Sequence, residues 1–304
     1  MANITAAMVK ELREMTGAGM MDCKKALTET DGNMDAAVEV LRKSGAAKME
    51  KKQSRIAAEG IARVAVKDNV AVVAEVNSET DFVAKNETFQ EFVQTVADTA
   101  LASDLNGGAN GEDIDALLNI NGLNDLLVEK TATIGEKLSI RRFAKVTGDI
   151  VTSYIHGGGR IGVIIAAKGT NNDAAKEALT NIAMQVAAMN PPYLKREDVP
   201  AAVLDEEKKI ILAQMAEDPK MANKPEQVKE KIAAGKVGKY YGENCLLEQA
   251  FVKENKETVQ SYVDGVAKAA GTTIAITDFV RFERGEGIEK KADNFAEEIA
   301  SMIK

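Results

Sequence analysis

The chain has 304 residues, of which 45% are hydrophobic and 4% aromatic, and its formal net charge at pH 7 is −8. This hydrophobic content supports substantial cores and argues against disorder over most of the length, and the length suggests two domains or one domain with additions. The negative charge argues against a nucleic-acid backbone as the main partner, because such binding needs clustered Lys and Arg. The basic stretch 48–55 is therefore read as a solvated linker rather than as a nucleic-acid arm.

Two further features of composition limit the class of protein. No run of 18 apolar residues is present, and the first residues lack the charged-then-apolar pattern of a signal peptide. The two cysteines, Cys23 and Cys245, are too far apart in sequence to form a disulfide framework. We expect a soluble cytoplasmic protein without a membrane partner, and another protein is the best candidate partner.

The first 45 residues are predicted to form a small bundle of three helices. Thr5 is placed to cap the first helix, and Asn33 to cap the third, which begins after the turn signal TDGN. Apolar residues recur at helical spacing in each of the three. Residues 44–55 are charged and are predicted to be a partly helical tether. A bundle this small has little core and is often a recognition module.

From residue 56 onward the pattern indicates two copies of one α+β unit with a small antiparallel sheet. The first copy has a hairpin over 61–66 and 70–76, helices over 89–102 and 113–130, and a strand over 138–148. The second copy has a hairpin over 151–156 and 161–167, a helix over 173–189 and a strand over 277–287. The pairs Arg142-Phe143 and Arg281-Phe282 echo each other in the final strands and suggest an internal duplication.

The second copy is interrupted by an insertion. Helical stretches at 203–217 and 228–243 flank a turn that contains proline, which predicts an antiparallel coiled-coil hairpin. A last helix is predicted over 291–304. The predicted domains are the N-terminal module and linker at 1–55, a first core subdomain at 56–148, a second at 149–282 with the insertion at about 195–250, and a C-terminal helical module at 283–304.

The sequence shows little sign of catalytic chemistry. The single histidine, His156, precedes Gly157-Gly158-Gly159, and an HGGG sequence can build the oxyanion hole of a hydrolase. That interpretation lacks a GxSxG nucleophile elbow, so a hairpin turn is preferred. One His and two distant Cys cannot supply a zinc site, and a P-loop motif is absent. We therefore expect a protein that is not an enzyme, with no metal site, no cofactor and no direct nucleotide binding.

Apolar side chains at unusual positions point instead to binding. Phe82, beside Asp81, follows the strand at 70–76 within the polar stretch NSETDFVAKN, and it is either a core residue or a contact for a partner. Met20 and Met21 begin a helix where a capping residue is usual. Methionine adapts well to binding surfaces, but both residues are equally well explained as part of the bundle core.

Four longer segments are distinctive: LREMTGAGMMDCKKAL at 12–27, EVNSETDFVAKNETF at 75–89, SYIHGGGRIGVIIAAKG at 153–169 and FVRFERGEGIEKK at 279–291. They resemble the elongation factor Ts family, the bacterial exchange factors of the GTPase elongation factor Tu. The resemblance runs from about residue 3 to the C-terminus, except that 105–135 is poorly matched. It implies a ubiquitin-associated-like N-terminal module, two related core subdomains, the coiled-coil insertion and a C-terminal helical module.

The resemblance also implies where the partner is bound. The segments expected to contact elongation factor Tu lie in the N-terminal module, after the strand at 70–76, and at the turn of the second hairpin. Their residues are Gly19, Met20 and Met21; Thr80, Asp81, Phe82 and Val83; and Tyr154, His156 and Gly157. Asp81 and Phe82 are expected to act on the Mg²⁺ site of the partner. A hydrolase built on His156 and Ser153, or a passive binding scaffold, are the alternatives.

Overall fold

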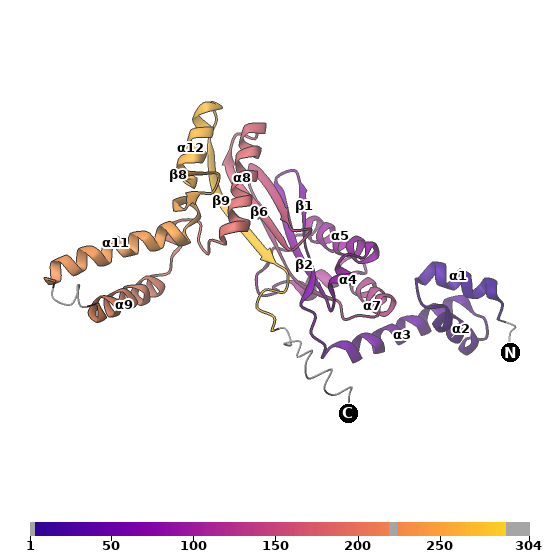
Figure 1. Ribbon diagram of the computed structural model, residues 1–304. Coiled ribbons are helices and arrows are strands. Elements are labelled where there is room, and N and C mark those ends of the chain that lie inside the picture. The colour runs from indigo at the N-terminus through magenta and orange to yellow at the C-terminus, as the bar shows by residue number, and fades with distance from the viewer. Residues whose placement is uncertain (1–3, 219–223, 290–304) are drawn as a thin grey trace.

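The computed structural model describes residues 4–218 and 224–289 and has the predicted α+β fold. Two small antiparallel sheets form the centre, a group of N-terminal helices lies on one side, and a long helical hairpin projects on the other (Figure 1). The helix predicted over 291–304 lies outside the described residues. The predicted domain boundaries stay a prediction.

The N-terminal helices are α1 (Ala6–Thr16), α2 (Met20–Glu29) and α3 (Met34–Lys52). Both predicted caps are present: Met8 N–H donates to the Thr5 hydroxyl at 3.3 Å, and Ala36 N–H donates to Asn33 Oδ1 at 3.0 Å. The helices share a small core that consists of Val9, Leu12, Cys23, Ala26, Leu27 and Ala37. A module with so few core residues depends on what it packs against.

The predicted tether at 44–55 is wrong in part, because α3 continues through it to Lys52. Lys48 in this stretch forms an ion pair with Asp22 of α2 at 2.7 Å, so the start of the basic run is bound to its own module. Gly45 lies against Val128, and a side chain at this position would meet the valine at 3.2 Å. The missing side chain allows α3 to pack closely against the helix that carries Val128.

The single helix predicted over 113–130 is also wrong. The structure has α6 (Ile114–Leu118) and α7 (Leu123–Ile134), and it is α7 that packs against α3. Asn121 and Gly122 separate the two helices with φ values of 51° and 70°. This left-handed conformation is costly for most residues but accessible to Asn and Gly, so the chain breaks there.

The first sheet contains β1 (Glu59–Lys67), β2 (Val70–Ser78), β3 (Gly107–Gly108) and β4 (Ser139–Thr147), in the order β1-β2-β4-β3. The short helix α4 (Asp81–Ala84) follows β2, and α5 (Glu87–Ala102) covers one face of the sheet. Phe89, Phe92 and Phe143 are fully buried in the core between this helix and the sheet. Their burial explains how a chain with few aromatics fills the layer.

The second sheet contains β5 (Ile150–His156), β6 (Ile161–Gly169) and β9 (Ile274–Glu283). It is covered by α8 (Asp173–Met189) and α12 (Val259–Ala269). Smaller elements complete this half: the 3₁₀ helices η1 (Arg196–Asp198) and η2 (Leu246–Glu248) and the ribbon of β7 (Ala250–Phe251) and β8 (Glu254–Thr258). Hairpin, helix and strand therefore occur in the same order in both halves, as predicted.

A shared irregularity supports the duplication, although the Arg-Phe echo does not. The register shifts after Glu75 in β2 and after Ala166 in β6, each the sixth residue of its strand. In this register Phe143 pairs with the fifth residue of β2, and Phe279 pairs with the fifth residue of β6. Phe143 therefore corresponds to Phe279 and not to Phe282, and the predicted match of the two Arg-Phe pairs was wrong by three residues.

The two sheets pack face to face in the centre of the molecule. Their shared core consists of small and β-branched residues together with one phenylalanine: Ala62, Ala71, Val73, Ala144, Val146, Val151, Ile164, Ala166 and Phe282. Gly162 lies so close to the other sheet that a Cβ would stand 2.9 Å from a methyl of Val73. Small residues at the contact bring the sheets close enough for dense packing.

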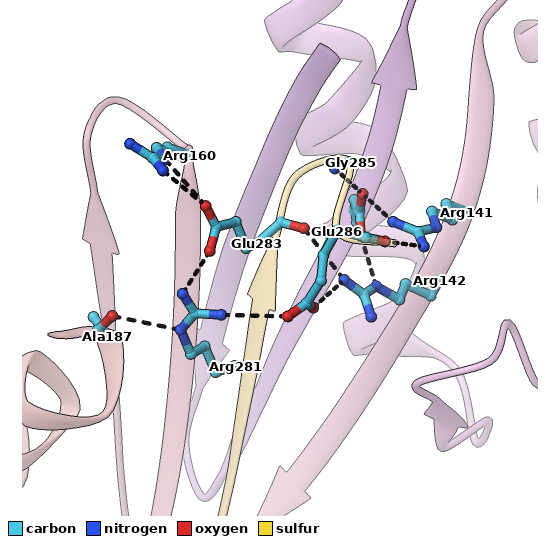
Figure 2. Close-up of polar contacts among 9 residues, drawn as sticks. Arg141, Arg142, Arg160, Ala187, Arg281, Glu283, Gly285 and Glu286 are labelled. Atoms are coloured by element: carbon cyan, nitrogen blue, oxygen red, sulfur yellow. Dashed lines mark hydrogen bonds and ion pairs between the residues drawn. The ribbon is translucent and has the colours of Figure 1, made fainter. Parts of the chain in front are cut away.

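A buried ionic network closes one end of this interface (Figure 2). Glu75 is fully buried and lies on the face of β2 that is turned toward the second sheet. It accepts hydrogen bonds from Arg142 Nε at 2.6 Å, Arg141 Nη1 at 2.9 Å and Gly285 N at 2.7 Å. Arg142 continues to Glu286 at 3.0 Å, and Arg141 donates to the Glu286 carbonyl. The segment after β9 is thereby held against the first sheet.

The register shift in β2 explains how two adjacent arginines reach one carboxylate. Neighbouring residues of a regular strand point to opposite faces. At the shift, Glu75 pairs with Arg142 and Val76 pairs with Ile140, which leaves Arg141 as the extra residue of a bulge. Gly285 has a φ of +70°, and a Cβ there would stand 2.1 Å from the Ala58 carbonyl oxygen. Glycine is required for its amide to approach Glu75.

The outer part of this network should give the protein a measurable pH dependence. Hydrogen bonds, first from Arg281 at 2.7 Å and then from Arg160 at 3.1 Å, hold the pKa of Glu283 below its usual range (Figure 2). A depressed pKa in the folded state contributes stability above the unfolded value of about 4.3, and this stability is lost as the pH falls through the folded value. Glu283→Gln should therefore lower the urea midpoint at pH 7, with a difference from wild type that shrinks below about pH 4. A difference that stays constant with pH would contradict this reading.

The insertion forms the predicted hairpin from α9 (Ala201–Glu217) and α11 (Glu226–Asn244), which pack on each other (Figure 1). Its base is fixed by Arg196, which donates two hydrogen bonds of 2.7 Å to the carboxylate of Glu248. Ile211 and Met215 are buried, whereas Ile210 and Leu212 are exposed. Among the residues that the structure describes, no helix has the length and apolar character to cross a membrane.

Candidate partner-binding site

Phe82 lies on the surface, with 79% of its area exposed. It belongs to α4, a single helical turn directly after β2, and Thr80 is the N-cap of this turn. Ala84 is buried and Val83 packs against the first core, so this side of the turn anchors it. Because adjacent residues of a helix point in different directions, this anchoring directs Phe82 toward water. The alternative that Phe82 is a core residue is wrong.

Asp81 lies next to Phe82 and carries a negative charge. Its carboxylate accepts a hydrogen bond from Lys85 Nζ at 2.7 Å, one helical turn along the chain. This hydrogen bond holds the pKa of Asp81 below its usual range. The turn therefore presents an aromatic ring and an ionised carboxylate side by side on the surface.

A carboxylate from a distant part of the chain contacts the start of this turn. Glu136 Oε2 accepts hydrogen bonds from the N–H groups of Glu79 and Thr80, both at 3.0 Å. Glu136 Oε1 accepts the Thr80 hydroxyl at 2.6 Å. All the predicted residues of this segment, from Thr80 to Val83, thus belong to one capped and anchored turn.

Met20 and Met21 form a second exposed apolar site, on the N-terminal module. They are 58% and 75% exposed, so the alternative that both pack inside the bundle is wrong. Gly19 is the N-cap of α2 and makes no side-chain capping bond. The methionines line a 540 Å³ groove together with apolar residues of α1 and three cations, Lys10, Arg13 and Lys24. An apolar groove with basic residues suits a partner surface that is apolar and acidic.

The third predicted site lies at the turn between β5 and β6. Gly157, Gly158 and Gly159 all have positive φ, at 58°, 64° and 97°, as the preferred hairpin interpretation requires. His156 is exposed, and its Nδ1 lies 3.1 Å from the hydroxyl of Tyr154. Tyr154 is half-buried and packs against the core between the second sheet and the helices that cover it. The strand therefore holds the tyrosine, and the tyrosine fixes the histidine ring.

This geometry does not favour a hydrolase. Ser153 and His156 are three residues apart on β5, so their side chains leave the strand on opposite faces. Tyr154, rather than a serine, contacts the imidazole. In residues 4–218 and 224–289, no group of three or more His, Cys, Asp or Glu is arranged to hold a metal ion.

The chain is similar to known proteins over its whole length. Residues 79–286 match the family model described as Elongation factor TS. Elongation factor Ts of Clostridioides difficile is 50% identical over all of both chains, and that of Nitratiruptor is 45% identical over 99% of both. The chain belongs to the elongation factor Ts family. The predicted resemblance is confirmed, and with it the assignment to the translation elongation factors.

The family assignment covers the candidate sites unequally. The match to the Elongation factor Ts model includes the turn with Phe82 and the turn with His156, whereas Met20 and Met21 lie before it. The whole-chain similarity to the Clostridioides difficile protein does include the N-terminal module. All three sites therefore belong to the part of the chain that is similar to elongation factor Ts.

Sequence reasoning missed two features of these sites. Glu136 follows a glycine at the end of α7, and nothing in its immediate sequence indicates that it contacts Thr80. The cations of the N-terminal groove were also missed, although the spacing of two of them in the sequence indicates a shared helix face. Lys10 and Arg13 lie three apart on α1, and such a spacing places both on one side of a helix.

Proposed function

We propose that the protein is a guanine-nucleotide exchange factor that binds elongation factor Tu carrying GDP and promotes release of the nucleotide. The observation that carries this proposal is the turn at Asp81 and Phe82, in which a fixed backbone presents an exposed aromatic ring beside an ionised carboxylate. Membership of the elongation factor Ts family supports the choice of partner. The proposal places the protein in the cytoplasm, with the translation machinery that it would serve.

The proposed activity is a coupling of two binding equilibria and needs no covalent step. A GTPase that holds GDP with nanomolar affinity gains about 12 kcal/mol from binding it. Weakening that affinity about 10⁴-fold requires a coupling of about 5.5 kcal/mol. A factor that binds the nucleotide-free state more tightly supplies this coupling, and by reciprocity an incoming nucleotide expels the factor. Under this proposal the protein is not an enzyme in the chemical sense.

Each candidate surface has a role in this scheme. Phe82 inserts into an apolar gap of the partner, and the adjacent Asp81 disturbs the environment of its Mg²⁺ ion. Because Mg²⁺ neutralises phosphate charge, disturbing its coordination loosens the nucleotide. Met20 and Met21 dock on the GTPase domain, and the turn with His156 contacts a second domain of the partner.

A nucleotide-release assay tests the proposal against its alternatives. Elongation factor Tu loaded with a fluorescent GDP analogue is mixed with the protein and excess unlabelled GDP, and release is followed over time. An exchange factor accelerates release, whereas a passive scaffold binds the GTPase and leaves the rate unchanged. The hydrolase alternative predicts esterase turnover that is lost in His156→Ala. Binding without acceleration would refute the proposed function.

The exposed methionines should contribute to docking rather than to the release step. Met20→Ala combined with Met21→Ala should raise the KM for elongation factor Tu about tenfold and change the maximal release rate little. The reason is that the pair lines the groove of the N-terminal module and is separate from the turn at Phe82. Met189→Ala, at an exposed methionine of α8, is the matched control. An unchanged KM in the double variant would remove the groove from the partner interface.

A further inference from the structure

The turn at Asp81 and Phe82 cannot hold its own orientation. It has four residues, and a helix of one turn is unstable without outside contacts. Its own cap is weak, because the bond from Val83 N–H to the Thr80 hydroxyl is long, at 3.4 Å. Val83 and Ala84 anchor its far side, while Asp81 and Phe82 face solvent. Something else must fix the end where the chain leaves β2.

Glu136 makes this contact, and both of its carboxylate oxygens take part. One carboxylate oxygen accepts two backbone N–H groups, from Glu79 and Thr80, and the other accepts the Thr80 hydroxyl. Backbone N–H groups at a helix start have no partner within the helix, so an outside acceptor is needed. Hydrogen bonds to an ionised acceptor are shorter and stronger than neutral ones.

Glu136 is itself held in place by a reciprocal contact. Glu79 Oε1 accepts the N–H of Lys137 at 2.5 Å, so residues 79–80 and 136–137 bind each other in both directions. Lys137 Nζ donates to the carbonyl oxygens of Gln53 and Arg55 just after α3, at 2.7 and 2.9 Å. Arg55 in turn forms an ion pair with Glu79 at 3.1 Å. Glu136 therefore lies in a group of contacts that joins the chain just after α3, just after β2 and just after α7.

We infer that Glu136 is a positioning residue, which keeps Phe82 aimed at the partner during nucleotide release. This inference rests on the proposed exchange function. An aromatic ring that displaces groups of its partner needs a rigid backbone, because a mobile turn would move away from the contact. Ordering such a turn on binding would also cost conformational entropy. Loss of Glu136 should therefore affect the release step more than docking, since Met20 and Met21 remain in place.

The test compares the maximal release rate with the KM in purified full-length variants. Glu136→Ala should lower the maximal rate of GDP release about tenfold and change the KM for elongation factor Tu less than about threefold. Glu136→Gln keeps one carbonyl acceptor without the charge, and its rate should lie between those of Glu136→Ala and wild type. Glu129→Ala is the matched control, because it removes a nearby carboxylate, on α7, that forms an ion pair with the adjacent Lys130 at 3.2 Å.

A double variant separates positioning from a general loss of structure. If Glu136 acts through Phe82, Glu136→Ala together with Phe82→Ala should release GDP no more slowly than Phe82→Ala alone. Hydrogen exchange in the free protein gives a readout that does not need the partner, and the amides of Glu79 and Thr80 should exchange about tenfold faster in Glu136→Ala.

The outcomes distinguish a failure of the positioning role of Glu136 from a failure of the role proposed for the turn at Phe82. A wild-type rate in Glu136→Ala beside a slow Phe82→Ala would overturn the inference and leave the proposed function standing. Additive losses in the double variant would also overturn it, because Glu136 would then act by another route. A wild-type rate in Phe82→Ala would instead refute the role of the turn itself. If Glu136→Ala fails to fold, Glu136→Gln decides, and a rate equal to wild type with unchanged amide exchange overturns the inference.

Discussion

Replacing Phe82 with alanine should slow GDP release from elongation factor Tu by about 10- to 100-fold. An aromatic side chain that fills a pocket of its partner typically contributes 2 kcal/mol or more, which is about 30-fold in an equilibrium constant. Because the ring is exposed in the free protein, its removal should change the free energy of unfolding by less than about 0.5 kcal/mol. The measurements are stopped-flow release of a fluorescent GDP analogue and urea unfolding.

Two controls make the Phe82 result specific. Val66→Ala removes another exposed apolar side chain, at the end of β1, and should release GDP at the wild-type rate. Asp81→Asn retains the size of the neighbouring side chain but removes its charge, so it isolates the proposed effect on the Mg²⁺ ion. Release at the wild-type rate in both Phe82→Ala and Asp81→Asn, with binding intact, would mean that the turn is not the element that disturbs the nucleotide site.

Replacing Glu75 with alanine should lower the free energy of unfolding by about 3–5 kcal/mol. Glu75 is fully buried between the sheets, and it is the acceptor for Arg141, Arg142 and the Gly285 amide. Its removal leaves Arg142, which is also buried, with less compensating charge and leaves the Gly285 amide without this acceptor. Breaking a buried ion pair on one side is much more costly than losing a surface pair.

The Glu75 prediction can be checked with a double-mutant cycle. Glu75→Ala, Arg142→Ala and the double variant are unfolded in urea, and the coupling energy is the departure of the double variant from the sum of the single ones. The double variant should lose less than that sum, because neither charge is then left behind. Glu177→Ala, at an exposed carboxylate of α8, should be near wild type. Strict additivity would mean that the two side chains do not act as a pair.

The sequence was sufficient to predict most of the architecture. Strand and turn composition predicted the two hairpins, helical periodicity predicted α5 and α8, and two helical stretches around a proline-containing turn predicted the insertion. The caps at Thr5 and Asn33 were also predicted, because short-range capping depends on residues close in sequence. The errors at α3 and between α6 and α7 concern where a helix continues or breaks. That depends on packing partners and on left-handed residues such as Asn121.

The sequence singled out Phe82 as a candidate contact, but it did not indicate which residue holds the turn of Phe82 in place. A phenylalanine in a polar stretch after a strand is visible in the sequence, and its exposure followed once Val83 and Ala84 packed inward. The choice between core and surface for Met20 and Met21 could not be made, because it depends on how three helices dock. The contact between Glu136 and Thr80 spans 56 residues of chain, and local sequence carries no signal for such a pairing.

The bulge that lies at the same point of both sheets carries different side-chain chemistry in the two halves. In the first half the extra residue is Arg141, and the irregular backbone gathers charges around Glu75. In the second half it is Thr277, whose hydroxyl donates to the carbonyl of Ala166 at 3.2 Å. The backbone defect is common to both copies, whereas its chemistry is not. The same irregularity of the backbone thus holds the segment at Gly285 and Glu286 against the first sheet in one half, and makes a single side-chain hydrogen bond within the sheet in the other.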